Sequence, residues 1–388
     1  MDITIQPTRL HGSVKAIASK SQAHRLLICA SFSDTETTLL CPETNRDIEA
    51  TANCLRALGA NITRTADSYH ILPIRNLPAS AVLNCCESGS TLRFMLPIAG
   101  ALGVDTLFLM EGRLPQRPLS PLWEEMVRMG CNLSRPTETS IRCEGKLKSG
   151  AYVIDGSVSS QFVTGLLFAL SLIEGKTTLE ITGKQESKPY IDMTRSAMAL
   201  FSAPDYHSPG RIEVEGDWSN GAFFLAAKAL GSDLTVTNLN PLSSQGDRMI
   251  TQLLPAFEKH CHVDAADIPD LVPILAVVAA AKEGAVFTNI RRLRLKESDR
   301  VMTVEKLIQS LGGKTESTEN ELTVYGTGLT GGTVNSYNDH RIAMAAAIAA
   351  TVCSRPVTIS GAEAVDKSYP SFWNEYRKLG GLYEQYLR

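Results

Sequence analysis

The sequence has no hydrophobic run long enough to cross a membrane. Its longest apolar stretch, residues 271–281, is well short of the roughly 20 residues that a membrane-spanning helix needs. It also lacks an N-terminal signal peptide, because residues 1–4 lead directly into strand-like alternation. The sequence therefore predicts a cytoplasmic protein with no membrane partner.

Paired cysteines are missing as well. The nine cysteines are scattered, and no two form a Cys-x-x-Cys pair. An odd, scattered set excludes a disulfide framework and favours a reducing compartment. His260-Cys261-His262 has the residue types of a metal site but no third ligand at a recognisable spacing. We interpret it as the exposed end of a helix and expect no metal site.

Neither sign of charge dominates. The chain has 38 basic and 41 acidic residues and a formal net charge of −3, which gives no general attraction to nucleic acid. It has no extended basic face interleaved with aromatic residues and no Walker-type lysine loop. Any anion site must therefore be a local arrangement of side chains.

Two kinds of helical segment alternate along the chain. The first kind starts with small polar residues and continues through about ten apolar ones, so we expect it to be buried. Its six copies begin at Ser19, Glu87, Ser159, Asp217, Asp267 and Asn338. The second kind is amphipathic and often ends in Leu-Gly or Met-Gly, where glycine suits the helix cap. Its six copies begin near Asp47, Pro121, Tyr190, Gly246, Glu297 and Tyr369.

Short β-like runs separate these helices. Six units of helix, strand, helix and strands predict an α/β protein of two similar domains, each with three repeated helix-strand subunits. We place the first domain at residues 13–215. The second would be discontinuous, formed by residues 1–12 plus 216–388, if the N-terminal strand returns to the second half of the chain.

The densest charge in the chain precedes one of the amphipathic helices, in residues 293–300. Apolar residues at 301, 304, 308 and 311 put one helix face into a core. The charges therefore lie at a helix N-terminus, where backbone N–H groups and the macrodipole favour anions. Lys296 and Arg300 add positive charge there, with Glu297 between them. Two interpretations stay open: a solvated helix start, or an anion site with a carboxylate placed for proton transfer.

Other helix starts also carry cations. Lys20 precedes an apolar helix, where its charge opposes the dipole unless an anion is shared with the backbone. Gly89 allows close approach to a ligand, and Arg93 adds a forked donor. Such a concentration predicts one small-molecule site for at least two anionic groups, a phosphate and a carboxylate. The cations are Lys20, Arg25, Arg93, Arg117, Lys296, Arg300, Arg341 and Lys367.

Two helix starts offer uncharged or acidic groups instead. Ser159, Ser160 and Gln161 suit neutral hydroxyls or the edge of a phosphate, but a simple helix cap explains them equally well. Asp270 precedes the most apolar helix of the chain. It either caps that helix or, if partly desolvated, acts as a general base.

Taken in order, these motifs resemble the 3-phosphoshikimate 1-carboxyvinyltransferase (5-enolpyruvylshikimate-3-phosphate synthase) family of enolpyruvyl transferases. The resemblance covers essentially the whole chain and implies two domains built as inverse α/β barrels and joined by a two-stranded hinge. It depends on Ser19-Lys20-Ser21 with Arg25, Gly89 with Arg93, Arg117-Pro118, Ser159-Ser160-Gln161, Lys188 to Asp192, Pro269-Asp270, Lys296 to Arg300, Asn338 to Arg341, and Lys367.

The resemblance implies transfer of the enolpyruvyl group of phosphoenolpyruvate to the 5-hydroxyl of shikimate 3-phosphate, with release of phosphate. This is a step of the shikimate pathway to chorismate and the aromatic amino acids. It would proceed by addition and elimination through a tetrahedral ketal, without a metal or organic cofactor. The first domain would bind mainly shikimate 3-phosphate, and the second would supply mainly phosphoenolpyruvate contacts and catalytic residues. We expect a monomer.

Individual roles follow from the motif match. Asp270 would be the base for the 5-hydroxyl, Glu297 the proton carrier at the methylene carbon, and Lys20 the group that neutralises departing phosphate. Shikimate 3-phosphate would meet Lys20, Ser21, Arg25, Ser159, Ser160, Gln161, Ser187, Tyr190, Asp270 and Lys296. Phosphoenolpyruvate would meet Lys20, Gly89, Arg117, Gln161, Arg300, Arg341 and Lys367. Arg93 and His340 are further candidates.

The chain departs from the family pattern at two places. It reads Glu87-Ser88-Gly89-Ser90 where many relatives read Asn-Ala-Gly-Thr, and it has Arg292 where some carry an asparagine. One alternative function is enolpyruvyl transfer to UDP-N-acetylglucosamine, which would be expected to need a cysteine in residues 113–117; none is present. Another is non-catalytic binding of phosphorylated metabolites, which gains nothing from the two carboxylates.

Overall fold

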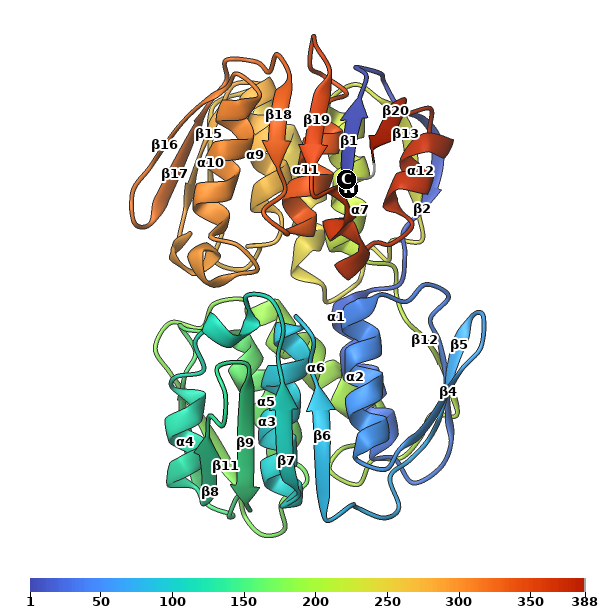
Figure 1. Ribbon diagram of the computed structural model, residues 1–388, viewed down its shortest axis with the longest axis vertical. Coiled ribbons are helices and arrows are strands. Elements are labelled where there is room, and N and C mark those ends of the chain that lie inside the picture. Colours follow the sequence, from blue (N-terminus) through green and yellow to red (C-terminus); the bar gives the residue numbers. More distant parts are fainter. Residues whose placement is uncertain (387–388) are drawn as a thin grey trace. The chain divides into compact units, whose positions relative to one another are not determined.

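The computed structural model describes residues 1–386, which form two compact units (Figure 1). The continuous unit is Ala18–Glu215. The split unit combines Met1–Ile17 with the chain from Gly216 onward. The chain thus passes between the units twice, after Ile17 and after Glu215. Within residues 1–386, no helix has the length and apolar character required to span a bilayer.

The continuous unit contains six α-helices and one 3₁₀ turn among ten strands. The helical elements are α1 (Lys20–Ser31), α2 (Arg46–Ala57), α3 (Gly89–Leu102), η1 (Leu114–Gln116), α4 (Leu122–Arg128), α5 (Ser160–Leu170) and α6 (Lys188–Leu200). The strands are β3 (Thr37–Leu40), β4 (Asn61–Arg64), β5 (Ser68–Leu72), β6 (Ser80–Asn84), β7 (Asp105–Leu109), β8 (Cys131–Ser134), β9 (Ser140–Gly145), β10 (Ala151–Asp155), β11 (Thr178–Thr182) and β12 (Arg211–Glu213).

The split unit has a matching set of elements in its described residues. Its helical elements are α7 (Trp218–Ala229), η2 (Gly246–Met249), α8 (Ile250–Leu253), η3 (Leu254–Glu258), α9 (Val272–Ala281), η4 (Arg291–Leu295), α10 (Arg300–Ser310), α11 (His340–Ala349), η5 (Ala362–Lys367) and α12 (Phe372–Lys378). Its strands are β1 (Asp2–Ile5), β2 (His11–Lys15), β13 (Asp233–Thr237), β14 (Cys261–Asp264), β15 (Ala285–Thr288), β16 (Lys314–Ser317), β17 (Glu321–Tyr325), β18 (Gly332–Asn335), β19 (Val357–Ser360) and β20 (Tyr383–Tyr386).

The sheets repeat one pattern. Each unit has two four-stranded sheets and one two-stranded sheet within residues 1–386. Every four-stranded sheet is a parallel pair extended by two antiparallel strands, in the orders β12-β3-β5-β4, β6-β7-β9-β8, β14-β15-β17-β16 and β18-β19-β1-β20. The two-stranded sheets, β10-β11 and β13-β2, are parallel. Each of the three sheets in a unit belongs to one helix-strand subunit, and this arrangement confirms the predicted α/β fold.

Strand pairing also explains where the units divide. The N-terminal strand β1 lies between β19 and β20, so the start of the chain belongs to the split unit. The next strand, β2, pairs with β13 as far as Lys15. A division at residue 13, the position expected from sequence, would cut through β2. The observed division follows Ile17.

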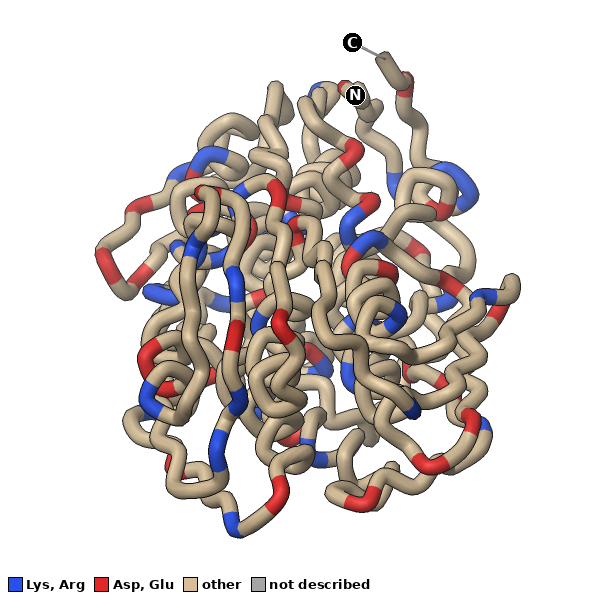
Figure 2. Tube along the Cα trace, turned by 60° about the horizontal axis from the view of Figure 1, so that its bottom comes forward, with Lys and Arg blue, Asp and Glu red and all other residues tan. Residues whose placement is uncertain are grey.

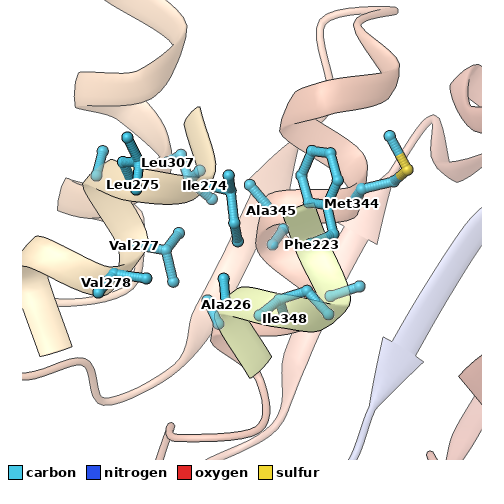
Figure 3. Close-up of a cluster of buried hydrophobic side chains, with 14 of the residues drawn as sticks. Phe223, Ala226, Ile274, Leu275, Val277, Val278, Leu307, Met344, Ala345 and Ile348 are labelled. Atoms are coloured by element: carbon cyan, nitrogen blue, oxygen red, sulfur yellow. The ribbon is translucent and has the colours of Figure 1, made fainter. Parts of the chain in front are cut away.

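The buried helices of the split unit form its core. Every residue of α11 and the segment Val272–Ala280 of α9 are buried. Figure 3 shows Ile274 and Val277 of α9 close to Ala226 of α7 and Ile348 of α11. These helices have no polar face because they are enclosed by other elements, as the sequence predicted.

In the continuous unit, α3 and α5 pack unusually closely. A Cβ atom on Gly165 of α5 would lie 2.1 Å from the carbonyl oxygen of Arg93 in α3, so only glycine fits there. This close contact brings the starts of α3 and α5 within reach of each other, which matters for the candidate site.

The amphipathic helices behave as predicted in α10, where Val301, Val304, Ile308 and Leu311 are all buried. The segment near Gly246 is instead broken into η2, α8 and η3. Pro255, inside η3, explains part of this break, because proline cannot continue an α-helix.

The expectation that His260-Cys261-His262 is the end of a helix was wrong. Residues 261–264 form strand β14, which pairs with β15, and the preceding helical turn ends at Glu258. Cys261 and His262 therefore open a strand, and His260 directly precedes it.

Candidate active site

The split unit holds a cluster of charges built around Arg300, the first residue of α10. Only 1% of its side chain is exposed. The guanidinium donates from Nε to Asp339 Oδ2 (2.9 Å), from Nη1 to Asp270 Oδ1 (2.5 Å) and from Nη2 to Glu297 Oε2 (2.6 Å). Burial by itself would lower the pKa of Arg300, but Asp339, Glu297 and Asp270 raise it well above its usual value. Arg300 is therefore a permanent cation that connects three chain segments.

Asp270 receives two further cations. Arg341 Nη2 donates to its Oδ2 (3.1 Å), and Lys296 Nζ lies 3.7 Å from its Oδ1. Burial alone would raise the pKa of Asp270, but Arg341, Lys296 and Arg300 together hold it well below its ordinary range. The cap position of α9 is Leu271, and no side chain caps that helix. Asp270 is thus an ionised member of the cluster rather than a helix cap.

Lys296 has a perturbed pKa. Burial lowers its pKa to about 8, although the neighbouring Asp270 favours the charged form. Its ammonium group is therefore protonated at neutral pH but titrates only slightly above it.

Asp339 organises the cluster from the start of α11. It is fully buried and accepts hydrogen bonds from Ser298 Oγ (2.9 Å), from Arg300 and from the backbone N–H of Arg341 (3.0 Å). The last bond makes it the N-cap of α11. A single carboxylate thus fixes the starts of α10 and α11 relative to each other.

Two more candidates lie at the start of α11. Lys367 Nζ donates to the carbonyl oxygen of Asn338 (2.8 Å), and His340 is buried beside Asp339. The cluster proper pairs three cations with three carboxylates, so those six groups balance; Lys367 adds one positive charge. Figure 2 shows basic and acidic positions mixed along the chain, which agrees with a local rather than a general positive charge.

In the continuous unit, a second group of side chains meets at the starts of α3 and α5. Arg93, which is buried, donates to Gln161 Oε1 (3.2 Å), to the Gly89 carbonyl (3.4 Å) and to the Pro118 carbonyl (3.1 Å). Gln161 Nε2 in turn donates to Ser90 Oγ (3.0 Å). The close packing of α3 on α5 makes this network possible.

Gly89 itself is surrounded by guanidinium groups. A Cβ atom there would lie 2.5 Å from Arg117 Nη1 and 2.6 Å from Arg93 Nη1. Gly89 is also the first residue of α3, whose N-cap is Ser88. Two guanidinium groups beside a helix N-terminus form a site suited to an anion.

Arg25 lies deep in the same unit. It donates to the Ser21 carbonyl (2.6 Å), the Tyr190 carbonyl (3.0 Å) and Thr194 Oγ1 (2.8 Å), all of which are neutral oxygens. Burial lowers the pKa of Arg25 to about 10. A buried cation held by neutral oxygens gains stability from an anionic ligand.

Lys20 has a carboxylate partner that the sequence did not reveal. Its Nζ lies 2.9 Å from Asp47 Oδ2, in the first turn of α2. Its charge at the start of α1 is therefore already balanced by Asp47, so an anion is not the only group that can stabilise it there.

Comparisons with known proteins identify the family. The family model described as EPSP synthase (3-phosphoshikimate 1-carboxyvinyltransferase) matches residues 5–261 and 253–376. The chain belongs to the EPSP synthase family. This confirms the resemblance seen in the sequence motifs.

Relatives of the EPSP synthase family match over nearly the whole chain. A 3-phosphoshikimate 1-carboxyvinyltransferase from Clostridium kluyveri is 38% identical, over 99% of this chain and 98% of the relative. One from Clostridium beijerinckii is 35% identical, over 99% of each. A solved EPSP synthase structure from Acinetobacter baumannii has a TM-score of 0.79 at 22% identity, covering 99% of this chain and all of that one, so it supports the fold.

The remaining candidates from the family motifs lie at helix starts of the continuous unit. Ser159 caps α5 by accepting from the backbone N–H of Gln161 (3.3 Å), and this cap does not exclude a contact with a substrate. Ser160 follows it and is buried. Ser187, also buried, has a positive φ of 54° immediately before α6, and Tyr190 lies in the first turn of that helix.

Sequence reasoning missed three acidic partners. Asp339 has the clearest signal, because it directly precedes an apolar run at a cap position. Asp47 gave no signal beyond opening an amphipathic helix. Asp247 is buried in the split unit and accepts a hydrogen bond from the Ser219 hydroxyl. Burial and the nearby Asp270 raise its pKa to about 7.

The Asp339→Asn substitution tests whether this carboxylate holds the cluster together. It keeps the shape but removes the charge that pairs with buried Arg300, so we expect the split unit to lose about 3 kcal/mol or more of unfolding free energy. Urea denaturation followed by fluorescence in a Trp123→Phe background would report this unit alone, since Trp218 and Trp373 both lie in it. Exposed Asp233→Asn is the matched control. Equal midpoints for the two variants would contradict the role given to Asp339.

Proposed function

We propose that this protein transfers the enolpyruvyl group of phosphoenolpyruvate to the 5-hydroxyl of shikimate 3-phosphate and releases phosphate. Membership of the EPSP synthase family supports this reaction, which belongs to the shikimate pathway to chorismate and the aromatic amino acids. The observation that carries the proposal is the pair of carboxylates, Asp270 and Glu297, both held by the buried Arg300. A site for anion binding alone would not need them.

Both units offer cationic groups that suit the anionic groups of the two substrates. Each substrate carries a phosphate and a carboxylate, and each unit offers cations at helix starts. For shikimate 3-phosphate we assign Lys20, Ser21, Arg25, Ser159, Ser160, Gln161, Ser187, Tyr190, Asp270 and Lys296. For phosphoenolpyruvate we assign Lys20, Gly89, Arg117, Gln161, Arg300, Arg341 and Lys367, with Arg93 holding Gln161 in place.

In the addition step, the oxygen of the 5-hydroxyl attacks C2 of phosphoenolpyruvate while Asp270 removes the proton of that hydroxyl. Glu297, which must enter this step in its acid form, gives a proton to the methylene carbon C3, which becomes a methyl group in a tetrahedral ketal. In the elimination step, Glu297 takes a proton back from that methyl group. The C2–O bond to phosphate breaks and the C2–C3 double bond forms again. The departing phosphate takes the proton that Asp270 holds, which returns Asp270 to its carboxylate form, and Lys20 neutralises the phosphate.

The resting pKa of Asp270 is too low for an effective base, so the mechanism needs a change on binding. Arg341 and Arg300 are assigned to phosphoenolpyruvate, and Lys296 to shikimate 3-phosphate. When the substrate anions draw these cations, Asp270 loses part of its compensating charge and gains two negative neighbours. Its pKa then rises toward the range in which it can accept a proton.

These steps use proton transfer and charge neutralisation by the residues of the chain, so the proposal includes no metal or organic cofactor. We further propose that the protein works in the cytoplasm as a monomer.

The direct test is a phosphate-release assay with phosphoenolpyruvate and shikimate 3-phosphate, repeated with UDP-N-acetylglucosamine as the acceptor. We expect turnover only with shikimate 3-phosphate. The Glu297→Gln variant should lose roughly a hundredfold or more in kcat, with nearly unchanged binding of shikimate 3-phosphate. Release with the sugar nucleotide alone would overturn the proposed acceptor, and an unchanged kcat would remove Glu297 from the mechanism.

The pKa of Lys296 predicts that the KM for shikimate 3-phosphate depends on pH. Its pKa of about 8 means that the cation is present at neutral pH and is lost as the pH rises through that value. The phosphate of the substrate is already fully ionised above its second pKa of about 6. The KM for shikimate 3-phosphate should therefore rise several-fold between about pH 7 and about pH 9.

The Lys296→Arg variant is the control, because a guanidinium stays charged over that range. We expect its KM for shikimate 3-phosphate to stay flat from neutral to alkaline pH. Parallel rises in the two proteins would show that another group titrates.

A further inference from the structure

A chain of hydrogen bonds crosses the core of the continuous unit from α1 to α3. His24 Nδ1 lies 2.7 Å from Thr51 Oγ1, Thr51 Oγ1 lies 2.7 Å from Thr91 Oγ1, and Thr91 Oγ1 donates to Ser88 Oγ (2.8 Å). All four side chains are buried. None of them is among the residues assigned to a substrate.

The hydrogen positions in this chain are determined by counting donors. The Thr91 hydroxyl is the donor toward both Ser88 Oγ and the Asp47 carbonyl, so its single proton points away from Thr51. Thr51 must therefore donate to Thr91. Thr51 can then only accept from His24, so the imidazole carries its proton on Nδ1. Burial, together with the charges of Lys20 and Arg25, lowers the pKa of His24 well below its usual value, so the ring is neutral. The direction of each hydrogen bond from His24 through Thr51 to Thr91 is therefore defined.

One end of the chain fixes the start of α3. Ser88 Oγ accepts from Thr91 Oγ1 and also from the backbone N–H of Thr91 (3.2 Å), which makes Ser88 the N-cap directly before Gly89. The position of the Gly89 backbone therefore depends on where Thr91 holds Ser88.

The same threonine reaches the partner of Lys20. Thr91 Oγ1 lies 3.4 Å from the carbonyl oxygen of Asp47, whose carboxylate pairs with Lys20. One contact of Thr91 thus leads to Gly89, which is assigned to phosphoenolpyruvate alone. The other leads to Lys20, which is assigned to both substrates.

A separate network serves the other substrate. Arg25 donates to Thr194 Oγ1 (2.8 Å), and Thr194 donates to the Tyr190 carbonyl (2.9 Å) and lies 2.9 Å from Thr164 Oγ1. Arg25 also holds the Ser21 carbonyl. These contacts lead to Ser21, Arg25 and Tyr190, which are assigned to shikimate 3-phosphate. The two networks share no residue.

We propose that the His24–Thr51–Thr91 chain is a positioning element for phosphoenolpyruvate, independent of the Arg25–Thr194 network that positions shikimate 3-phosphate. Thr51 is its central positioning residue, since its hydroxyl is the only link between α1 and α3 along this chain. This inference depends on the proposed function, which assigns Gly89 to phosphoenolpyruvate alone, and the expected split between the two KM values follows from Gly89.

The test is a pair of substitutions with opposite expected effects. Thr51→Val keeps the shape of the side chain but removes the hydroxyl. We expect the KM for phosphoenolpyruvate to rise about tenfold, the equivalent of one lost hydrogen bond. The KM for shikimate 3-phosphate should stay within about twofold of the wild-type value. Thr194→Val should give the reverse split. Thr51→Ser restores the hydroxyl and should restore the phosphoenolpyruvate KM.

Thr106→Val is the matched control for burial. Thr106 is a fully buried threonine on β7 of the same unit. Its hydroxyl donates to the carbonyl of Val104 (2.9 Å), just before that strand and outside both networks. It should leave both KM values unchanged. If Thr51→Val cannot be purified in a folded state, Thr91→Val breaks the chain at its next hydroxyl and should produce the same phosphoenolpyruvate effect.

Equal rises of both KM values in Thr51→Val, or an unchanged KM for phosphoenolpyruvate, would overturn the inference. Nitrogen-15 NMR gives an independent readout: we expect a neutral His24 ring with its proton on Nδ1, and a proton on Nε2 would contradict the arrangement. Absence of turnover in the wild-type protein would instead refute the proposed function, so the two failures can be told apart.

Discussion

The candidate site of the split unit depends on one constraint: Arg300 is a guanidinium removed from water, and it must be compensated within hydrogen-bond distance. Asp339, Asp270 and Glu297 provide that compensation from the start of α11, the segment before α9 and the residues before α10. Satisfying the guanidinium therefore also brings both proposed catalytic carboxylates together. The same interactions keep Asp270 ionised and weakly basic until other anions draw the surrounding cations.

The repeated architecture explains why functional groups gather at helix starts. Each subunit is built on a parallel pair of strands, and in β6-α3-β7, β14-α9-β15 and β18-α11-β19 a buried helix connects the pair. Such a helix has no polar face, so its first turn is where polar side chains and unpaired backbone N–H groups can meet a ligand. Close helix packing then determines which helix N-termini lie next to each other. Gly165 allows this close packing between α3 and α5.

Much of this could be predicted from the sequence, because it depends on local patterns. Residue spacing alone predicts the apolar stripe of α10, the alternation of two helix types and the cations at helix starts. Pairings between distant segments are not. Nothing local indicates that Asp47 balances Lys20, that Asp339 meets Arg300, or that β2 pairs with β13 and so moves the unit boundary. The cap of α10 is Asp299, and the hydroxyl of the neighbouring Ser298 is bonded to the distant Asp339 instead.

The central claim is that substrate anions take cations away from Asp270. The most direct measurement is a crystal structure with phosphoenolpyruvate and shikimate 3-phosphate bound. We predict that Arg341 Nη2, now 3.1 Å from Asp270 Oδ2, will have left that oxygen for the substrate carboxylate. A bound complex in which Arg341 keeps its contact with Asp270 and makes none with phosphoenolpyruvate would contradict the account.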